Sequence, residues 1–538
     1  MTWIRLTWTP LLVCAAALLG CPPSTPDSPD ASTPDASIPD ASTPDASTGY
    51  EWDGGYVPLE ETGNTWTDTG PFAPCTFTTP PGGGSCTDFS IFDLSACNTG
   101  SLANAGTEGQ YMLTTRSSDE PPYFFTAGLV LKSDGGTQYL NAEPITMEAR
   151  DGNARFYSST RTFADGGTIG TLLATCEAPQ APGFTGCSAF CRNGRVLLTE
   201  TFQARRLKWR DGESEASGLE LVSENPVDIG APVDVYVTKG HAYVVSIIEL
   251  GRAGGLTVFD VGNPSAPVKV KTIQLETDHF WNGVWASGDA LYVASASRGV
   301  LVFDISTPAD PQLLRKLPGG NINVHTVFAE GNRLYAASSS GILIFDITKP
   351  LEPVELNRYA PYPGLPHDMF ARGDRLYVNY AGHGYMVADV SNPDDLRTLG
   401  TFEYPAQFSH ANAVGTFAGR TLAFEGGEGP GEHLRVLDVT NPANIVKIGS
   451  FRLRPEISIH NMVLVGKKLY VAWYQEGVRV LDVSNPTQPT QVAYYNTWRE
   501  LDSDPGLYFA GAFSLRVPGD GYIYVADSWR GLLILREQ

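Results

Sequence analysis

From about Gly218 to its C-terminus, the chain repeats one short phrase at a nearly constant interval. Each copy has a glycine (histidine at His433), four mostly apolar residues, an aspartate and a turn rich in Ser, Asn and Pro, as in GILIFDITKP from Gly341. The aspartates recur every 42 to 49 residues, at Asp260, Asp304, Asp346, Asp389, Asp438 and Asp482. A period of this length built from short strands is typical of a radial array of four-stranded units.

One repeat divides into four predicted strands, a to d, which begin at Val324, Arg333, Gly341 and Pro353. A helical period of 3.6 residues is absent. The last copy stops without an outer strand, which the weak copy between Leu219 and Ile229 can supply, so that the ring closes and leaves no open edge. The sequence therefore predicts an all-β fold with a seven-bladed β-propeller over residues 213–538. Six or eight blades stay open as alternatives.

The repeated phrase, [GH]-x-x-[IV]-x-D-[VI]-[ST]-x-P, resembles the LVIVD repeat of bacterial and archaeal cell-surface proteins. Gly262 and Arg536 depart from the pattern, where Ser or Thr and Asp are expected. The resemblance implies a surface β-propeller and no defined activity.

The N-terminus has the pattern of an export signal. Arg5 precedes an apolar run from Leu11 to Gly20 that is too short to span a bilayer, and the run ends in LLGC. This ending resembles a bacterial lipobox, with Cys21 as the lipidated residue, and Pro22 after it resembles outer-membrane sorting. We predict a lipoprotein signal peptide over residues 1–21 and a protein lipid-anchored to the bacterial outer membrane or cell surface. An ordinary cleaved signal peptide is the alternative.

Residues 22–70 are predicted to be a disordered tether. They contain PDAS-like units, in which proline favours extended backbone and the aspartates repel one another. Residues 71–212 follow, with strand-like runs and hairpin turns such as SDGG that predict a small β-domain. All six cysteines outside the predicted signal peptide lie there, at Cys75, Cys86, Cys97, Cys176, Cys187 and Cys191. In an exported protein an even set predicts three disulfides, with fifteen connectivities open. A zinc site is disfavoured because paired CxxC motifs and histidines are missing from the region.

A formal net charge of −22 argues against nucleic acid as a partner, since phosphate binding needs a basic patch. We expect a monomer that meets the membrane through its lipid and a protein or glycan at the cell envelope. No nucleophile elbow, HExxH, P-loop or dinucleotide motif is present, so we assign no catalytic residue. The repeated aspartate has a structural explanation, because its carboxylate can accept hydrogen bonds from the following turn.

Histidines recur near the start of strand a. His325, His367 and His460 each precede the glycine of the a–b turn by six residues, whereas His279 and His410 precede it by nine. Strand a lines the axis of a propeller, so these five imidazoles are predicted to converge at one mouth of the channel. Such a cluster suits a divalent transition metal if the rings lie within about 8 Å of one another, given bonds of about 2 Å. Alternatively, each histidine closes its blade by a hydrogen bond to a neighbouring backbone.

Loops on the same face carry further candidates. The turn from Glu425 to His433 brings Glu425, Glu428 and Glu432 to the mouth, and the insertion after Asn496 is expected to form a solvated lid. We predict a ligand face formed by Asp234, Trp281, Asp368, His383, Glu425 and Trp473. Two functions follow: binding or scaffolding of a protein or glycan partner, or a metal-dependent enzyme of the oxidase or hydrolase type at the histidines.

Overall fold

The computed structural model describes residues 51–63, 68–79, 81–83, 85–120, 122–163, 165–405, 407–500, 502, 505–506 and 508–538. The predicted signal peptide, Cys21 and residues 22–50 of the tether lie outside this set. Within it, regular structure is β-strand apart from two short 3₁₀ helices, η1 (Thr99–Asn104) and η2 (Pro442–Asn444). The predicted all-β class is therefore confirmed. In these residues, no helix has the length and apolar character that a membrane span requires.

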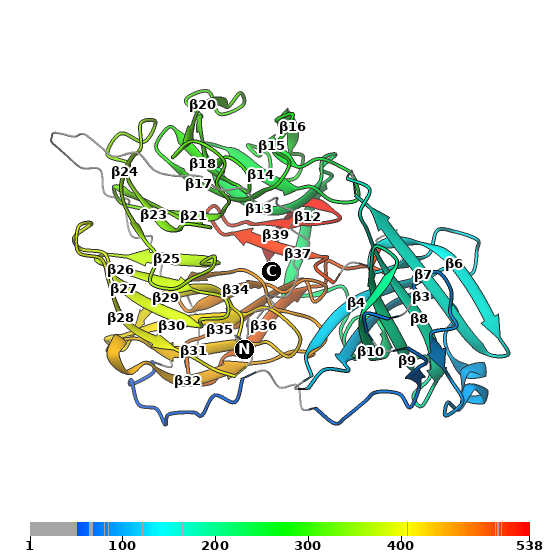
Figure 1. The fold of residues 1–538 in the computed structure, drawn as a ribbon. Coiled ribbons are helices and arrows are strands. Elements are labelled where there is room, and N and C mark those ends of the chain that lie inside the picture. The colour runs from blue at the N-terminus through cyan, green and yellow to red at the C-terminus, as the bar shows by residue number, and fades with distance from the viewer. Residues whose placement is uncertain are drawn as a thin grey trace, which may run out of the picture.

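The N-terminal domain is an eight-stranded antiparallel barrel, which lies beside the propeller in Figure 1. Pairing of the last strand with the first closes it, with Phe202 opposite Thr115. Leu129, Leu173 and Phe202 are fully buried in its core. Its strands are β3 (Gly109–Ser117), β4 (Phe124–Leu131), β5 (Tyr139–Leu140), β6 (Glu143–Asp151), β7 (Ala154–Thr162), β8 (Thr168–Glu177), β9 (Phe184–Arg192) and β10 (Arg195–Arg206).

Three disulfides hold the segment before the barrel against β8 and β9. They join Cys75 to Cys187, Cys86 to Cys191 and Cys97 to Cys176. The held segment contains the short pair β1 (Thr76–Phe77) and β2 (Phe92–Asp93). The prediction of three disulfides is confirmed, and one of the fifteen connectivities is selected.

The propeller has seven blades arranged in a ring. Blade 1 contains β13 (Ala231–Thr238), β14 (His241–Ile247), β15 (Gly255–Asp260) and β16 (Val268–Ile273). Blade 2 contains β17 (Trp281–Ser287), β18 (Ala290–Ser295), β19 (Gly299–Asp304) and β20 (Gln312–Leu317). Blade 3 contains β21 (Val324–Glu330), β22 (Arg333–Ser338), β23 (Gly341–Asp346) and β24 (Val354–Tyr359).

Blade 4 contains β25 (Asp368–Arg372), β26 (Arg375–Asn379), β27 (Tyr385–Asp389) and β28 (Arg397–Phe402). Blade 5 contains β29 (Ser409–Phe417), β30 (Arg420–Gly427), β31 (Leu434–Asp438) and β32 (Val446–Phe451). Blade 6 contains β33 (Met462–Val465), β34 (Lys468–Ala472), β35 (Val478–Asp482) and β36 (Thr490–Tyr495). Blade 7 contains β37 (Ala512–Arg516), β38 (Ile523–Asp527) and β39 (Gly531–Glu537).

The ring closes with strands from both ends of the propeller sequence. β12 (Leu219–Asn225) pairs with β39 as the outer strand of blade 7, with Leu219 opposite Glu537. β11 (Ala216–Ser217) adds a fifth strand to blade 6. The prediction that the missing strand comes from the weak first copy is confirmed, and the alternatives of six or eight blades are excluded.

The repeated phrase has a steric and a hydrogen-bonding explanation. Gly299 and Gly477, which begin strand c in blades 2 and 6, have φ near +75°, and a Cβ there would lie 2.0–2.1 Å from a carbonyl oxygen of strand d. Each of the six aspartates accepts a hydrogen bond of 2.7–3.0 Å from the backbone N–H two residues later. The structural role of these aspartates is confirmed.

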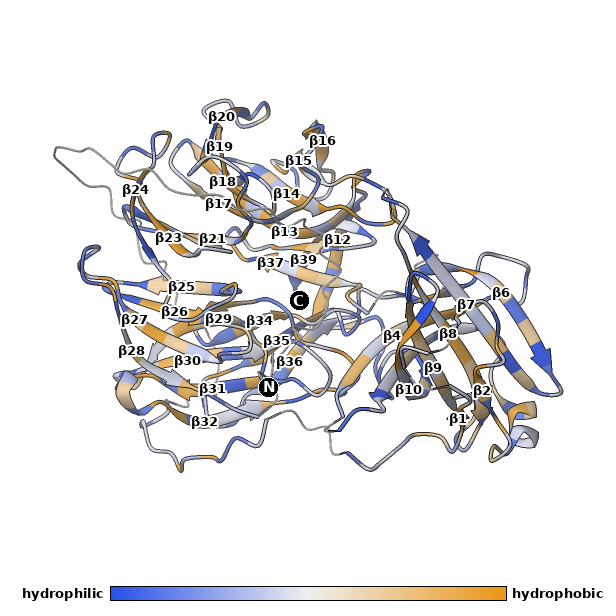
Figure 2. Ribbon diagram, in the orientation of Figure 1, coloured by the Kyte–Doolittle hydropathy of each residue, from blue (hydrophilic) through white to orange (hydrophobic). Residues whose placement is uncertain are grey.

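Hydrophobic residues run along the strands of both domains (Figure 2), and strand c is buried along nearly its whole length in each blade. One apolar cluster crosses from the barrel into the propeller. It includes Met112 and Leu207 of the barrel with Tyr474, Trp498 and Tyr508 of the propeller, all at most 8% exposed. The two domains therefore share part of their core.

Polar contacts secure this interface on loops of blades 5 to 7. Trp498 donates from Nε1 to Gln110 Oε1 at 2.9 Å, and Trp209 donates to the Trp498 carbonyl at 2.7 Å. Arg205 pairs with Glu456, and Arg206 pairs with Glu500. The insertion after Asn496 was expected to be a solvated lid. That expectation is wrong for Trp498 and Tyr508, which the barrel buries.

Residues 51–63 pack along blade 5 although their composition resembles that of the tether. Trp52 is buried, and the Tyr56 hydroxyl donates to Asp438 at 3.0 Å. Glu61 lies 3.0 Å from Arg435 Nε and 2.7 Å from Lys447 Nζ. We call residues 51–63 the strap. The predicted tether up to residue 70 thus includes a stretch that is bound to the propeller.

Candidate functional site

Four imidazoles form a row around the propeller axis, one from each of blades 3 to 6. Ring centroids are 4.2 Å apart between His325 and His367, 4.0 Å between His367 and His410, and 4.3 Å between His410 and His460. The rings are mostly buried, and His410 is only 2% exposed. Adjacent rings therefore meet the proximity that shared metal ligation requires.

A β-bulge at the start of strand a directs these side chains. His325 and His410 are the extra residues in the pairing of β21 with β22 and of β29 with β30. A bulge re-aims a side chain and is common beside functional sites. His367 and His460 occupy the same position, where their N–H groups bond to Asn379 O at 2.8 Å and Ala472 O at 3.0 Å. Blades 1, 2 and 7 place Val233, Asn282 and Phe513 at this bulge.

Glu428 supplies a carboxylate beside the row. Its N–H donates to Phe408 O at 2.9 Å, which holds it at the start of β29. Its two carboxylate oxygens lie 3.7 Å from His410 Nε2 and 3.9 Å from His460 Nε2. Ligand atoms of His367, His410 and Glu428 all lie within 4.8 Å of one another. Among the described residues, the other group of this kind is Cys75, Cys97 and Cys176, whose sulfurs are already in disulfides.

Hydrogen bonds show which ring nitrogens are available. His460 Nδ1 lies 2.6 Å from the Phe513 carbonyl, which can only accept, so Nδ1 donates and the lone pair lies on Nε2. His325 Nε2 accepts from Asn282 Nδ2 at 3.2 Å. Within the described chain, His367 Nδ1 and both nitrogens of His410 lack a hydrogen bond of normal geometry, although the His367 ring faces the backbone of His410 and the His410 ring faces that of His460. His367, His410 and His460 therefore offer unused lone pairs.

Burial keeps these rings neutral. It lowers the pKa of His325 to about 4 and that of His460 to about 3. The pKa values of His367 and His410 fall well below the ordinary value because burial is reinforced by the neighbouring imidazoles. Burial also raises the pKa of Glu428 to about 7, against the opposing hydrogen bond from Tyr474. Neutral imidazole is the form that binds metals.

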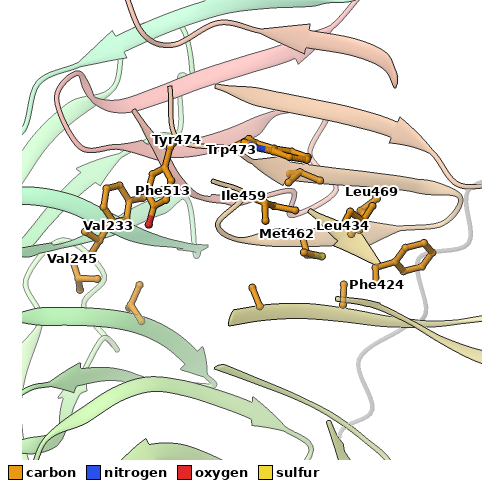
Figure 3. Close-up of a cluster of buried hydrophobic side chains, with 14 of the residues drawn as sticks. Val233, Val245, Phe424, Leu434, Ile459, Met462, Leu469, Trp473, Tyr474 and Phe513 are labelled. Atoms are coloured by element: carbon orange, nitrogen blue, oxygen red, sulfur yellow. The ribbon is translucent and has the colours of Figure 1, made fainter. Parts of the chain in front are cut away.

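Aromatic side chains lie at both ends of the site. On the mouth side, the Tyr474 ring lies 4.9 Å from His460 and 5.5 Å from Phe509, and it lies beside Phe513 in Figure 3. Toward the opposite face, strand a carries a second tier of rings at centroid distances of 4.4–5.2 Å, formed by Tyr236, Trp285, Phe328 and Phe370. The histidine row therefore lies between two apolar layers.

Three residues predicted for the site lie elsewhere. His279 precedes β17, and its carbonyl accepts from Gly254 N at 3.1 Å; its ring has no contact with the row in the described residues. Trp281 and Trp473 are fully buried in the core, where Trp281 packs at 6.0 Å from Phe303 and Trp473 donates to Ile457 O at 3.1 Å. The predicted ligand face is therefore wrong for both tryptophans.

The remaining predicted ligand-face residues have other contacts. Asp234 accepts hydrogen bonds from Val284 N and Ser514 Oγ, which joins three blades near the axis. Burial raises the pKa of Asp368, which interacts with Asp234, to about 7. His383 is partly exposed and stacks on Tyr362 at 5.0 Å.

Glu425 was selected from the acidic turn, but the structure places Glu428 at the histidines. Glu425 is directly opposite Arg435 in the pairing of β30 with β31 and forms a buried ion pair at 3.2 Å. In the sequence, Arg435 ten residues later was the signal that Glu425 forms an ion pair. Tyr474, which donates to Glu428, is not among the predicted site residues.

The family model described as "LVIVD repeat" matches residues 229–274, 282–316, 460–497 and 512–535. The chain contains LVIVD repeats. The matched stretches correspond to blades 1, 2, 6 and 7, whereas three of the four row histidines lie in the LVIVD propeller's blades 3 to 5.

No curated protein matches the chain. Among solved structures, the WD40 β-propeller domain of Doa1 is 13% identical, with a TM-score of 0.45 over 60% of this chain and 98% of that one. The computationally designed Ika8 protein is 11% identical, with a TM-score of 0.40 over 74% and 97%. A chain of the mitotic checkpoint complex is 13% identical, with a TM-score of 0.41 over 59% and 98%.

Proposed function

We propose that this propeller binds one divalent first-row transition metal ion between His367, His410, His460 and Glu428. The observation that carries the proposal is the set of unused nitrogen lone pairs on buried rings that surround one carboxyl group. Buried polar atoms without partners are rare in proteins. A bound cation would give one nitrogen of each of these rings a partner.

The donor set and its spacing suit such an ion. Imidazoles with a single carboxylate favour Zn, Cu, Fe or Ni, whereas Ca and Mg prefer oxygen ligands. Two ligands of a tetrahedral zinc lie roughly 3.4 Å apart when the bonds are about 2.1 Å long. The three atoms within 4.8 Å of one another would have to approach by up to about 1.4 Å, which rotation of a side chain can supply.

Closure of the blades is the alternative role for the row. His460 bonds to the Phe513 carbonyl of the next blade, as that reading predicts. In blades 2 and 3 the equivalent bonds come from Asn282 and Thr326, which donate to the carbonyls of His325 and His367. The His367 and His410 rings also face the backbone of the next blade's histidine. A backbone cap nevertheless does not require histidine, because asparagine and threonine make it in blades 2 and 3.

The test is metal analysis of protein purified from an oxidising compartment and dialysed against Zn²⁺, Cu²⁺ or Co²⁺. We expect one equivalent in the parent and a loss of at least tenfold in affinity in His410→Gln. His279→Gln is the matched control, because His279 lies outside the row, and it should retain the full equivalent. Less than 0.1 equivalent in the parent, or unchanged binding in folded His410→Gln, would refute metal binding.

We also propose export and lipid anchoring at Cys21. The three disulfides indicate an oxidising compartment. The lipobox-like LLGC and the following tether support attachment at Cys21. Cys21→Ser should abolish labelling by radioactive palmitate and move the protein from the membrane to the soluble fraction. Unchanged labelling would refute this anchor.

A second candidate function of the β-propeller scaffold is the binding of a protein or glycan at the envelope. The barrel contacts loops of blades 5 to 7. In blade 4, by contrast, Tyr362 and His383 are partly exposed and form a stacked pair at 5.0 Å. Stacked aromatic surfaces suit sugars and peptides. Replacing both residues by alanine should weaken retention on immobilised cell-wall glycan, and equal retention would refute this candidate.

A further inference from the structure

Two turns of the propeller have the same backbone but different side chains. The turn between β26 and β27 in blade 4 and the turn between β34 and β35 in blade 6 make matching hydrogen bonds. In blade 4, Tyr380 N bonds to Gly384 O at 2.8 Å and Ala381 N bonds to Ser409 O at 3.1 Å. In blade 6, Trp473 N bonds to Gly477 O at 2.9 Å and Tyr474 N bonds to Ala512 O at 3.1 Å. Ala381 and Tyr474 therefore occupy equivalent positions.

Both residues adopt the left-handed conformation, and the tyrosine is the more strained of the two. φ is +45° at Ala381 and +34° at Tyr474. A bulky residue with positive φ is a genuine outlier, and such conformations cluster at functional sites. Gly511 leaves room for this turn, since a Cβ there would lie 2.4 Å from Tyr474 O. The chain thus keeps a large side chain where blade 4 has alanine.

The Tyr474 side chain contacts the proposed site directly. Its hydroxyl donates to Glu428 Oε1, and within the described residues it is the one hydrogen-bond donor to that carboxyl group. Its ring packs at 4.9 Å from His460 and 5.0 Å from Phe513. With Oε1 held by the phenol, Oε2 remains directed at His410 Nε2, 3.7 Å away.

We infer that Tyr474 is the positioning residue of the metal site and makes Glu428 a ligand through one oxygen, Oε2. The inference rests on the proposed metal binding. Hydrogen bonds to a ligating carboxylate restrict its orientation, and their removal typically lowers metal affinity 10- to 100-fold. The hydrogen bond from its hydroxyl to Glu428 would thus explain why a tyrosine occupies this strained backbone conformation.

The experiment compares the parent with Tyr474→Phe, Tyr474→Ala and the control Tyr380→Phe, using Co²⁺ as the probe. Tyr380, a residue as buried as Tyr474, loses a hydroxyl that bonds to Tyr362 O at 2.8 Å, away from Glu428. Alanine is native to the equivalent turn in blade 4, so Tyr474→Ala should fold. Competition with a chelator gives the affinity, and the visible absorption of bound Co²⁺ reports its ligand geometry.

Tyr474→Phe should bind one Co²⁺ with a 10- to 100-fold higher Kd and shifted absorption bands. The increase in Kd should be at least as large in Tyr474→Ala. Tyr380→Phe should match the parent in both measurements. A purely structural role would lower Tm without moving the bands, so an unchanged spectrum and Kd in Tyr474→Phe would overturn the inference while metal binding stood. A parent that binds no Co²⁺, Zn²⁺ or Cu²⁺ would overturn the proposed function itself.

Discussion

Glu61 is the residue through which the strap should contribute most to stability. Its carboxylate lies 3.0 Å from Arg435 Nε and 2.7 Å from Lys447 Nζ, and both cations are almost completely buried. Arg435 keeps Glu425 and Glu432 when Glu61 is neutralised, at 3.2 and 2.8 Å. In the described chain, Lys447 has no other carboxylate within 4 Å. Removal of one member of a buried pair costs about 3–5 kcal/mol.

We therefore expect Glu61→Gln to lower the free energy of unfolding by about 3–5 kcal/mol in urea denaturation. Glu60→Gln is the matched control, because Glu60 is the exposed neighbour, and it should change stability by less than about 0.5 kcal/mol. Arg435, His433 and Lys447 hold the pKa of Glu61 far below its usual range, against burial as the largest opposing effect. A lowered pKa gives a contribution that is complete above the unfolded value of 4.5 and is lost progressively as pH falls from there toward the folded value, so the difference should be complete at pH 6 and begin to shrink near pH 4. A loss below about 1 kcal/mol would refute the reasoning.

Three further outcomes test the fold. Burial raises the pKa of Glu200 in the barrel to about 6; the folded value exceeds the unfolded one, so stability should fall by about 2 kcal/mol between pH 4.5 and 7. Urea unfolding of Glu200→Gln should lack this dependence, and a parent whose stability is flat over that range would contradict it. Gly128→Ala should cost about 1–3 kcal/mol, because a Cβ would lie 1.5 Å from Gly506 O at the domain interface; an unchanged Tm would contradict that packing. Asp346→Ala should cost on the order of 1 kcal/mol by losing the 2.7 Å bond from Thr348 N, whereas Asp346→Asn should retain most of it in the same melting experiment.

The propeller could be predicted because its determinants are local and repeated. The glycine that begins strand c and the aspartate that ends it make contacts within one blade, so one copy of the repeat is enough to predict the strand and its turn. Ring closure followed from one missing strand, which β12 supplies. The barrel could not be derived in the same way, because pairings such as Cys75 with Cys187 join residues more than 100 positions apart.

The histidine row was predicted only in part, since counting from the a–b glycine assumes hairpins of equal length. β29 is longer than the inner strands of its neighbours, so His410 occupies the bulge in blade 5 although it precedes the turn glycine by nine residues rather than six. The strap shows a different limit. Its composition resembles a linker, yet Trp52 packs into the apolar core, Tyr56 bonds to Asp438 and Glu61 pairs with Arg435, more than 370 positions away.

The distribution of side chains around the ring supports a role for the histidine row beyond blade closure. All seven blades present an equivalent position at the start of strand a, and Val233, Asn282 and Phe513 occupy three of them. Backbone closure would be needed in every blade, whereas the histidines occupy four consecutive blades. Their arc includes blades 5 and 6, whose loops bring Glu428 and Tyr474 to the same point. A structural cap can be made by asparagine or threonine as well as by histidine, whereas one local site predicts histidines that are confined to part of the ring.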